Sequence, residues 1–83
     1  MKYYDELKEV IAEVLGVDES EITPETKFAE DLDADSLDIT EIIMGMEEKL
    51  NVKLIDDDAD ADQIAEIKTV QDAMDRIEEV LGK

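Results

Sequence analysis

The sequence lacks cysteine, histidine and tryptophan, and its 83 residues include one proline and three glycines. The absence of cysteine excludes disulfide bonds. The aromatic residues are limited to Tyr3, Tyr4 and Phe28, so a folded core must be built from aliphatic side chains. At 43% hydrophobic residues, the apolar content is too high for a disordered acidic tail. The length suits one domain with a modest core, and we predict a single domain over residues 1–83.

Positive charge is also scarce, because 8 Lys and Arg residues face 26 Asp and Glu residues, which gives a net charge of -18. A sequence pI of about 4.1 argues against nucleic acid and anionic membranes as partners and favours basic protein surfaces or cations. No apolar run is long enough to span a bilayer, and no charged-then-apolar leader is recognisable. We therefore expect a cytoplasmic protein without membrane insertion, and a monomer.

Apolar residues recur at helical spacing in three long stretches, which predicts an all-α fold. The helices are expected at about Lys2 to Leu15, Ser36 to Asn51 and Val70 to Leu81, with a minor helix around Asp60 to Glu66. Gly16 and Gly82 supply C-terminal stops, and Thr69 is a candidate N-cap. The predicted architecture is a small up-down bundle of three main helices and one short helix.

Between the first two helices, residues 17–35 follow no regular pattern and are interrupted by Thr23-Pro24 and several acids. Three apolar residues in this stretch, Ile22, Phe28 and Leu32, are expected to attach it to the core. We interpret it as a long ordered loop, and loops of this length in a small domain are usually functional.

Ser36 stands between Asp35 and Asp38 at the start of the second predicted helix. Asp35 or Ser36 can cap that helix, and a capping role is common for such residues. A catalytic serine usually needs a neighbouring base, and the chain has no histidine. A phosphate, by contrast, suits the N–H groups at a helix start. If Ser36 takes part in chemistry, it receives a group rather than attacking a substrate.

The second predicted helix also carries an unusual exposed face. Leu37 and Met44 lie off its apolar stripe, and no Lys or Arg occurs from Phe28 to Glu48. A helix exposed only to water usually mixes charges, because oppositely charged i,i+4 pairs are mildly stabilising. We therefore predict a partner-binding surface made of Asp35, Leu37, Asp38, Glu41, Met44, Glu47 and Glu48.

The acidic residues suggest two other functions. Asp56, Asp58, Asp60 and Asp62 alternate as in a calcium-binding EF-hand loop, but Ala61 stands where that loop needs glycine and Ile67 where it needs glutamate. We expect weak divalent-cation binding and no dedicated metal site. No pair of carboxylates is predicted in an apolar pocket, so we assign no catalytic residue and expect no enzymatic activity.

The segment Phe28-Ala-Glu-Asp-Leu-Asp-Ala-Asp-Ser-Leu-Asp38 resembles the prosthetic-group attachment segment of acyl carrier proteins. Residues 41–48 resemble the helix that follows it in that family, and the similarity extends to residues 22–26 and 69–73. The Asp-Ser-Leu core alone is a weak signal. The whole set, in this order and spacing, is specific and covers nearly the whole chain.

The resemblance implies that Ser36 carries a 4′-phosphopantetheine arm, transferred from coenzyme A by a phosphopantetheinyl transferase. The arm's thiol would hold acyl chains as thioesters, and the acidic face would dock on basic patches of acyl-transferring and chain-elongating enzymes. Other cargoes, such as polyketide or aminoacyl units, stay open, as does an acidic helical adaptor or cation-binding protein without a prosthetic group. The sequence departs from the family pattern at Asp33, where many members have glycine, and in a longer segment from Leu54 to Lys68.

Overall fold

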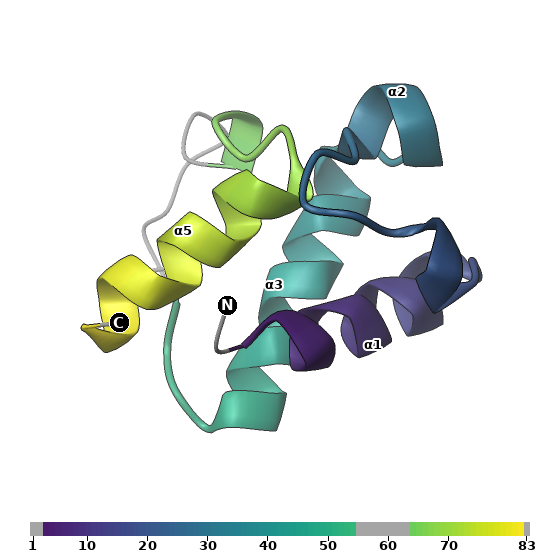
Figure 1. Cartoon of the computed structure of the whole chain (residues 1–83). Helices are drawn as coiled ribbons and strands as arrows, with labels where there is room; N and C mark the ends of the chain where they lie inside the picture. Colours follow the sequence, from purple (N-terminus) through teal and green to yellow (C-terminus); the bar gives the residue numbers. More distant parts are fainter. Residues whose placement is uncertain (1–2, 55–63, 83) are drawn as a thin grey trace.

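The computed structural model describes residues 3–54 and 64–82. The described residues form helices α1 (Tyr4–Leu15), α2 (Phe28–Leu32), α3 (Ser36–Leu50) and α5 (Val70–Leu81), with a 3-10 turn at Glu19–Glu21. Figure 1 shows α3 running through the molecule, with α1 packed against it, α5 beside them and α2 above the N-terminal end of α3. The predicted all-α fold with three main helices is confirmed. No helix in these described ranges is long and apolar enough to cross a bilayer.

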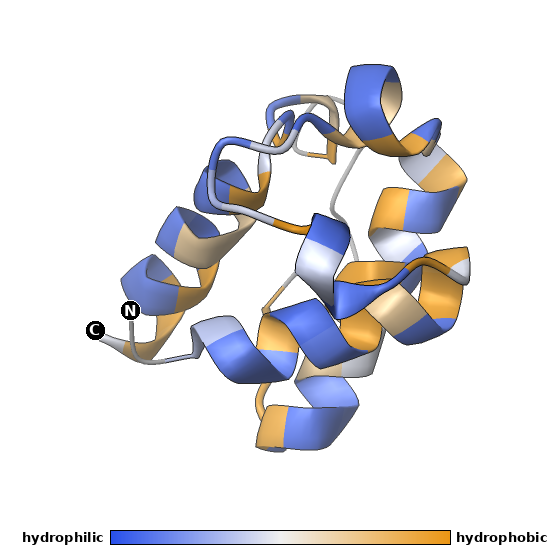
Figure 2. Ribbon diagram, turned by 45° about the vertical axis from the view of Figure 1, so that its right-hand side comes forward, coloured by the Kyte–Doolittle hydropathy of each residue, from blue (hydrophilic) through white to orange (hydrophobic). Residues whose placement is uncertain are grey.

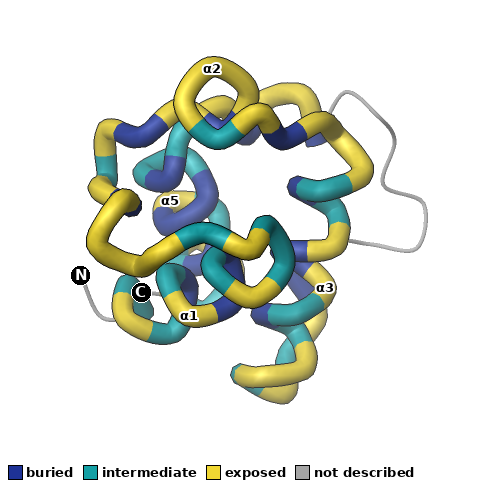
Figure 3. The backbone as a smooth tube through the Cα atoms, turned by 90° about the vertical axis from the view of Figure 1, so that its right-hand side faces the viewer, coloured by how far each residue is buried: buried dark blue, intermediate teal, exposed yellow. Residues whose placement is uncertain are grey.

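Each long helix buries the apolar stripe that its sequence predicts. The residues of the core, contributed by all three long helices and by the connecting segments, are Leu7, Val10, Ile11, Ile22, Phe28, Ala34, Ile39, Ile42, Ile43, Met46, Leu54, Ile64, Ile67, Val70, Ala73, Met74 and Ile77. Figure 2 shows the hydrophobic sides of the helices turned towards one another, and Figure 3 shows the buried stretches facing the interior. Burying such aliphatic side chains contributes about 1.5–3 kcal/mol each relative to leaving them exposed in water.

The helix ends follow the expected capping chemistry. The Thr69 hydroxyl accepts the N–H of Asp72 at 3.1 Å, and the Asp72 carboxylate accepts the N–H of Thr69, so the predicted cap of the last helix is confirmed as a capping box. Gly16 and Gly82 adopt left-handed conformations at the C-terminal ends of α1 and α5. Helix α3, the second of the three long helices, ends at Leu50, one residue before the predicted end, because Asn51 is left-handed with φ 56°.

One expectation was wrong in part. The stretch of residues 17–35 is not only a loop, because it contains the five-residue helix α2. The carboxylate of Asp31 accepts the N–H of Lys27, and the buried ring of Phe28 fixes this short helix to the core. A helix of five residues is too short to display a helical period in the sequence. The expected attachment is confirmed, since Ile22 and Phe28 are buried and Leu32 is partly buried against the core.

The minor helix predicted around Asp60 to Glu66 and the acidic run from Asp56 to Asp62 lie largely or wholly outside the described residues, as does Lys2. Within the described residues, Ile64 at the end of this stretch and Ile67 just after it are both buried.

Close packing of α1 on α3 depends on a glycine. A Cβ atom built on Gly45 would lie 2.7 Å from Cγ1 of Val10, a distance at which neighbouring atoms must move. The absence of a side chain at Gly45 therefore lets the two helices approach at this point. Beside this contact, Lys49 of α3 forms an ion pair with Glu9 of α1.

Candidate functional site

Helix α3 begins with a reciprocal pair of hydrogen bonds between Asp35 and Asp38. The N–H of Asp38 donates to Oδ1 of Asp35 at 3.0 Å, and the N–H of Asp35 donates to Oδ2 of Asp38 at 3.3 Å. Asp35 has an extended backbone and is the N-cap, so Ser36 is the first residue of the helix proper. Of the two candidate caps in the sequence, Asp35 performs the capping.

The hydroxyl of Ser36 is consequently not used to hold the helix start. Ser36 is exposed, and its side chain has no hydrogen-bond partner among the described residues. The Ser36 backbone carbonyl accepts the Thr40 hydroxyl at 2.8 Å. The N–H groups of Ser36 and Leu37 have no acceptor within the described part of the chain, and unpaired N–H groups at a helix start favour an anion.

The turn before Ser36 is formed by an exposed residue, Asp33, and a buried residue, Ala34. Asp33 ends α2 in the left-handed region with φ 55°, a conformation that glycine adopts without strain and other residues rarely adopt. Ala34 is buried, and its N–H donates to the Phe28 carbonyl at 2.9 Å. The departure from the family pattern at Asp33 therefore falls where the backbone favours glycine.

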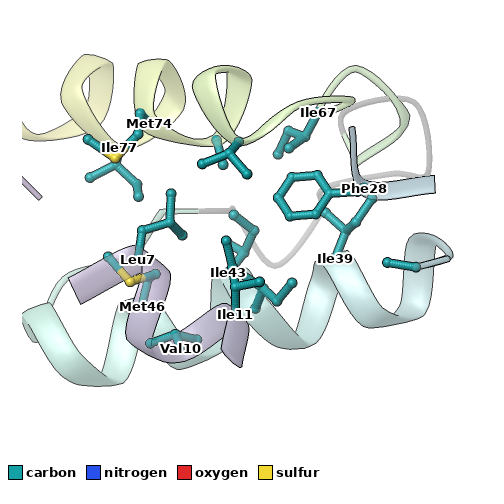
Figure 4. Packing of buried hydrophobic residues seen from close by; sticks show 14 of the residues in the cluster. Leu7, Val10, Ile11, Phe28, Ile39, Ile43, Met46, Ile67, Met74 and Ile77 are labelled. Atoms are coloured by element: carbon teal, nitrogen blue, oxygen red, sulfur yellow. The ribbon is translucent and has the colours of Figure 1, made fainter. Parts of the chain in front are cut away.

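A groove of about 660 Å³ opens beside Ser36. Its walls come from α2, the first turns of α3 and residues 64–69, and they include Phe28, Ile39 and Ile67. Figure 4 shows these three side chains gathered at one end of the core, with Leu7, Met46, Met74 and Ile77 at the other end. The groove thus connects the exposed hydroxyl to an apolar part of the interior.

Backbone hydrogen bonds hold two walls of this groove together. The Phe28 N–H donates to the Lys68 carbonyl at 2.9 Å, and the Val70 N–H donates to the Thr26 carbonyl at 3.0 Å. Lys27 and Thr69 form an isolated antiparallel bridge at the same place. Segments about forty residues apart in the sequence are therefore joined next to Ser36, and sequence periodicity carries no signal of this contact.

The predicted partner-binding residues divide into two groups in the structure. Leu37 and Met44 expose 66% and 57% of their surface, and Glu41 and Glu48 are exposed beside them on α3. These four residues are available to a partner.

The other acids of that prediction take part in hydrogen bonds within the chain. Asp35 and Asp38 bind each other's N–H groups. Oε2 of Glu47 accepts the N–H of Leu54 at 2.8 Å, and Glu47 is only partly exposed. The neighbouring Leu54 is 2% exposed, so the Glu47 carboxylate satisfies a backbone donor next to the core.

No group of three or more Asp or Glu residues suited to a metal ion occurs in residues 3–54 and 64–82. The stretch that suggested weak divalent binding, Asp56 to Asp62, lies outside that range.

Two similarities to known proteins bear on the family of this chain. Residues 5–77 match the family model described as phosphopantetheine attachment site. The chain is also 46% identical, over the full length of both chains, to a curated acyl carrier protein from Solidesulfovibrio magneticus. The matched range contains Ser36, both walls of the groove and the exposed face of α3. On this combination of fold, site geometry and full-length similarity, the chain belongs to the phosphopantetheine-bearing acyl carrier protein family.

Proposed function

We propose that Ser36 is the attachment residue for 4′-phosphopantetheine and that residues 1–83 act as a single carrier domain for acyl intermediates. The observation that carries this proposal is the exposed Ser36 hydroxyl, which capping by Asp35 leaves free at the start of α3. In the attachment reaction, Ser36 Oγ forms a bond to the phosphorus of coenzyme A that joins the arm. The bond from that phosphorus to the nucleotide breaks, and the hydroxyl proton leaves.

The residues around Ser36 fit such a group. The hydroxyl is accessible to an enzyme, and the free N–H groups at the helix start suit the negative charge of a phosphodiester. When bound, the arm supplies the thiol that this cysteine-free chain lacks. The groove of about 660 Å³ beside Ser36 offers apolar side chains, including Phe28, Ile39 and Ile67, to shield an acyl chain from water.

The exposed face of α3 supports the second part of the proposal, which concerns partners. Leu37 and Met44 offer apolar contacts, and Glu41 and Glu48 attract basic side chains. Charges at the rim of an interface mainly speed association and set its salt dependence. We propose that the phosphopantetheinyl transferase and the acyl-transferring and chain-elongating enzymes dock here through basic, partly apolar patches. Cytoplasmic location and a monomeric state stay predictions from the sequence.

The attachment residue is tested by incubating the protein with coenzyme A and a promiscuous phosphopantetheinyl transferase, followed by intact mass measurement. Ser36→Ala should abolish the mass gain. Because Asp35 rather than Ser36 caps α3, the stability change should stay within about 0.5 kcal/mol, as for an ordinary surface substitution.

Ser20→Ala is the matched control, because Ser20 is the other serine of the chain and is also exposed. It should gain mass like the wild type. A mass gain that persists in Ser36→Ala would overturn the assignment of the attachment residue.

The docking face is tested by Glu41→Lys, which reverses an exposed charge between Leu37 and Met44. Association with the transferase should slow by roughly three- to tenfold and lose part of its salt dependence. Glu19→Lys makes the same charge change in the 3-10 turn, away from α3, and should slow association less. Equal effects of the two variants would mean that only net charge matters and that α3 is not the docking face.

A further inference from the structure

Four methionines supply all the sulfur of this chain, which has no cysteine. Met46 and Met74 are fully buried in the core, whereas Met44 exposes 57% of its surface. Met44 is neither a core residue nor one of the partly buried residues packed against the core. Met1 lies outside the described residues. Within the described ranges, Met44 is therefore the methionine whose side chain is open to molecules in the solvent.

The exposure of Met44 follows from its position on α3. Successive residues of a helix are turned by about 100°, so Met44 and the buried Met46 point in nearly opposite directions. The residues one turn away on the same side as Met44 are Glu41 and Glu48, and both are exposed. These carboxylates and the net charge of -18 repel an anionic oxidant but not a neutral one. The surroundings of Met44 therefore favour a neutral oxidant such as hydrogen peroxide.

We propose that Met44 is a reversible oxidation site, at which hydrogen peroxide converts the thioether into a sulfoxide and thereby weakens docking on α3. In this step the O–O bond of the peroxide breaks and one oxygen forms a bond to Sδ of Met44. The other oxygen keeps both protons and leaves as water. The sulfur is oxidised by two electrons, and the peroxide is reduced by the same two. A methionine sulfoxide reductase, which draws two electrons from thiols, reverses the change.

The effect on docking rests on the proposed function of the α3 face. A thioether is flexible and apolar, which suits contacts with partners of different shape, whereas a sulfoxide is polar. Burying this polar group against an apolar partner surface without a hydrogen bond is unfavourable. The fold should not respond, because Met44 takes no part in the core. Oxidation at this position should therefore weaken binding and leave stability nearly unchanged.

The test treats the apo protein with hydrogen peroxide, because a thiol on the arm would also react, and assigns each sulfoxide by fragment-ion mass spectrometry. Met44 should be oxidised roughly tenfold faster, or more, than Met46 and Met74, whose oxidation requires the fold to open. The dissociation constant for a phosphopantetheinyl transferase should rise by roughly five- to tenfold, and the melting temperature should stay within about 3 °C. Methionine sulfoxide reductases should then restore the original mass and affinity.

Two leucine variants provide matched controls, and each is compared with itself before and after peroxide, so that any effect of the substitution on docking cancels. Met44→Leu should lose the response of affinity to peroxide, because leucine has no sulfur to oxidise. Met46→Leu should keep the response of the wild type, because Met44 is still present. A loss of affinity in peroxide-treated Met44→Leu equal to that of the wild type would overturn the inference, as would oxidation of Met46 or Met74 as fast as Met44.

Attachment to Ser36, measured before peroxide is added, separates this inference from the proposed function. An untreated wild type that gains no mass with coenzyme A and the transferase defeats the proposed function. Complete mass gain before treatment, together with an affinity that does not change when Met44 is oxidised, defeats the inference alone.

Discussion

The two sides of helix α3 differ in their surroundings, because one side packs against α1 and the other is exposed to solvent. Towards α1, Met46 is fully buried, Gly45 allows close contact with Val10, and Lys49 pairs with Glu9. Towards solvent, Leu37 and Met44 are exposed beside Glu41 and Glu48, and none of these acids belongs to an ion pair within the described part of the chain. One side packs within the fold, and the other is the exposed face that we propose for docking.

The three ion pairs described also differ in what they connect. Lys27–Glu30 and Arg76–Glu79 are i,i+3 pairs within or beside a single helix, whereas Lys49–Glu9 joins α3 to α1. The fold therefore places one of its few cations where two acidic helices meet. This difference between the two sides of α3 can be tested by matched substitutions.

The largest effect is expected from methionine-to-alanine substitutions on opposite sides of α3. Met46→Ala removes a fully buried side chain and should lower the free energy of unfolding by about 2–5 kcal/mol. Met44→Ala removes a side chain that is 57% exposed and should change it by less than about 0.5 kcal/mol. Urea unfolding followed by circular dichroism measures both.

The effects of the two substitutions on binding to the transferase should be in the reverse order. Met44→Ala should weaken binding to the transferase, and Met46→Ala should bind normally under conditions where it is folded. Similar losses of stability in the two variants would contradict the division of α3 into a packed side and a docking side.

A smaller effect is expected from Lys49→Gln, which removes the cation between α3 and α1. The hydrogen bond to Glu9 is the main cause that raises the pKa of Lys49 above its ordinary value of 10.5, and the charges of Glu13 and Glu6 add to it. A raised pKa in the folded state means that the stabilisation is complete below the unfolded-state pKa and is lost as pH rises through the folded-state value. The melting temperature of Lys49→Gln should therefore fall below that of the wild type near neutral pH. The difference should begin to shrink near pH 10.5 and vanish once the pH exceeds the higher pKa of Lys49 in the folded protein.

Lys27→Gln is the matched control, because the Lys27–Glu30 pair lies on the surface and joins no second long helix. Exposed i,i+3 pairs contribute little, so this variant should melt closer to the wild type. If Lys27→Gln and Lys49→Gln lower the melting temperature equally, the position of Lys49 between two helices adds no stability beyond that of an ordinary surface ion pair.

The smallest effect is expected from added salt. With a net charge of -18, the folded chain repels itself, and salt screens charges separated by more than the Debye length, about 8 Å at physiological ionic strength. The melting temperature should rise by a few degrees from low to high NaCl, and MgCl₂ at equal ionic strength should raise it at least as much. A melting temperature that does not respond to either salt would mean that the acids are too far apart for their repulsion to destabilise the folded chain.

Much of the fold could be predicted from local patterns. The last helix occupies the predicted range, Val70–Leu81, and Thr69 caps it. The helix after Ser36 begins where it was expected. Helix α2 could not be predicted, because its five residues are stabilised by Phe28 packing against distant parts of the chain rather than by a periodic pattern of their own.

The candidate site also has features that the sequence predicts and features that it does not. Ser36 stands out in the sequence through its neighbours, and the free state of its hydroxyl follows from local capping by Asp35. The groove beside it joins Phe28 to Ile67, and no local pattern relates residues that far apart.

Glu47 and Glu48 show most directly where the sequence by itself stops. The order of residues determined that both lie on an acidic helix that follows an attachment motif, because helical periodicity and composition are properties of neighbouring residues. Only the tertiary structure decided their surroundings. The left-handed turn at Asn51 brings the Leu54 N–H to the carboxylate of Glu47, while Glu48, one residue further along the helix, points to solvent. Two identical side chains thus differ because the chain folds back on one side of the helix and not on the other.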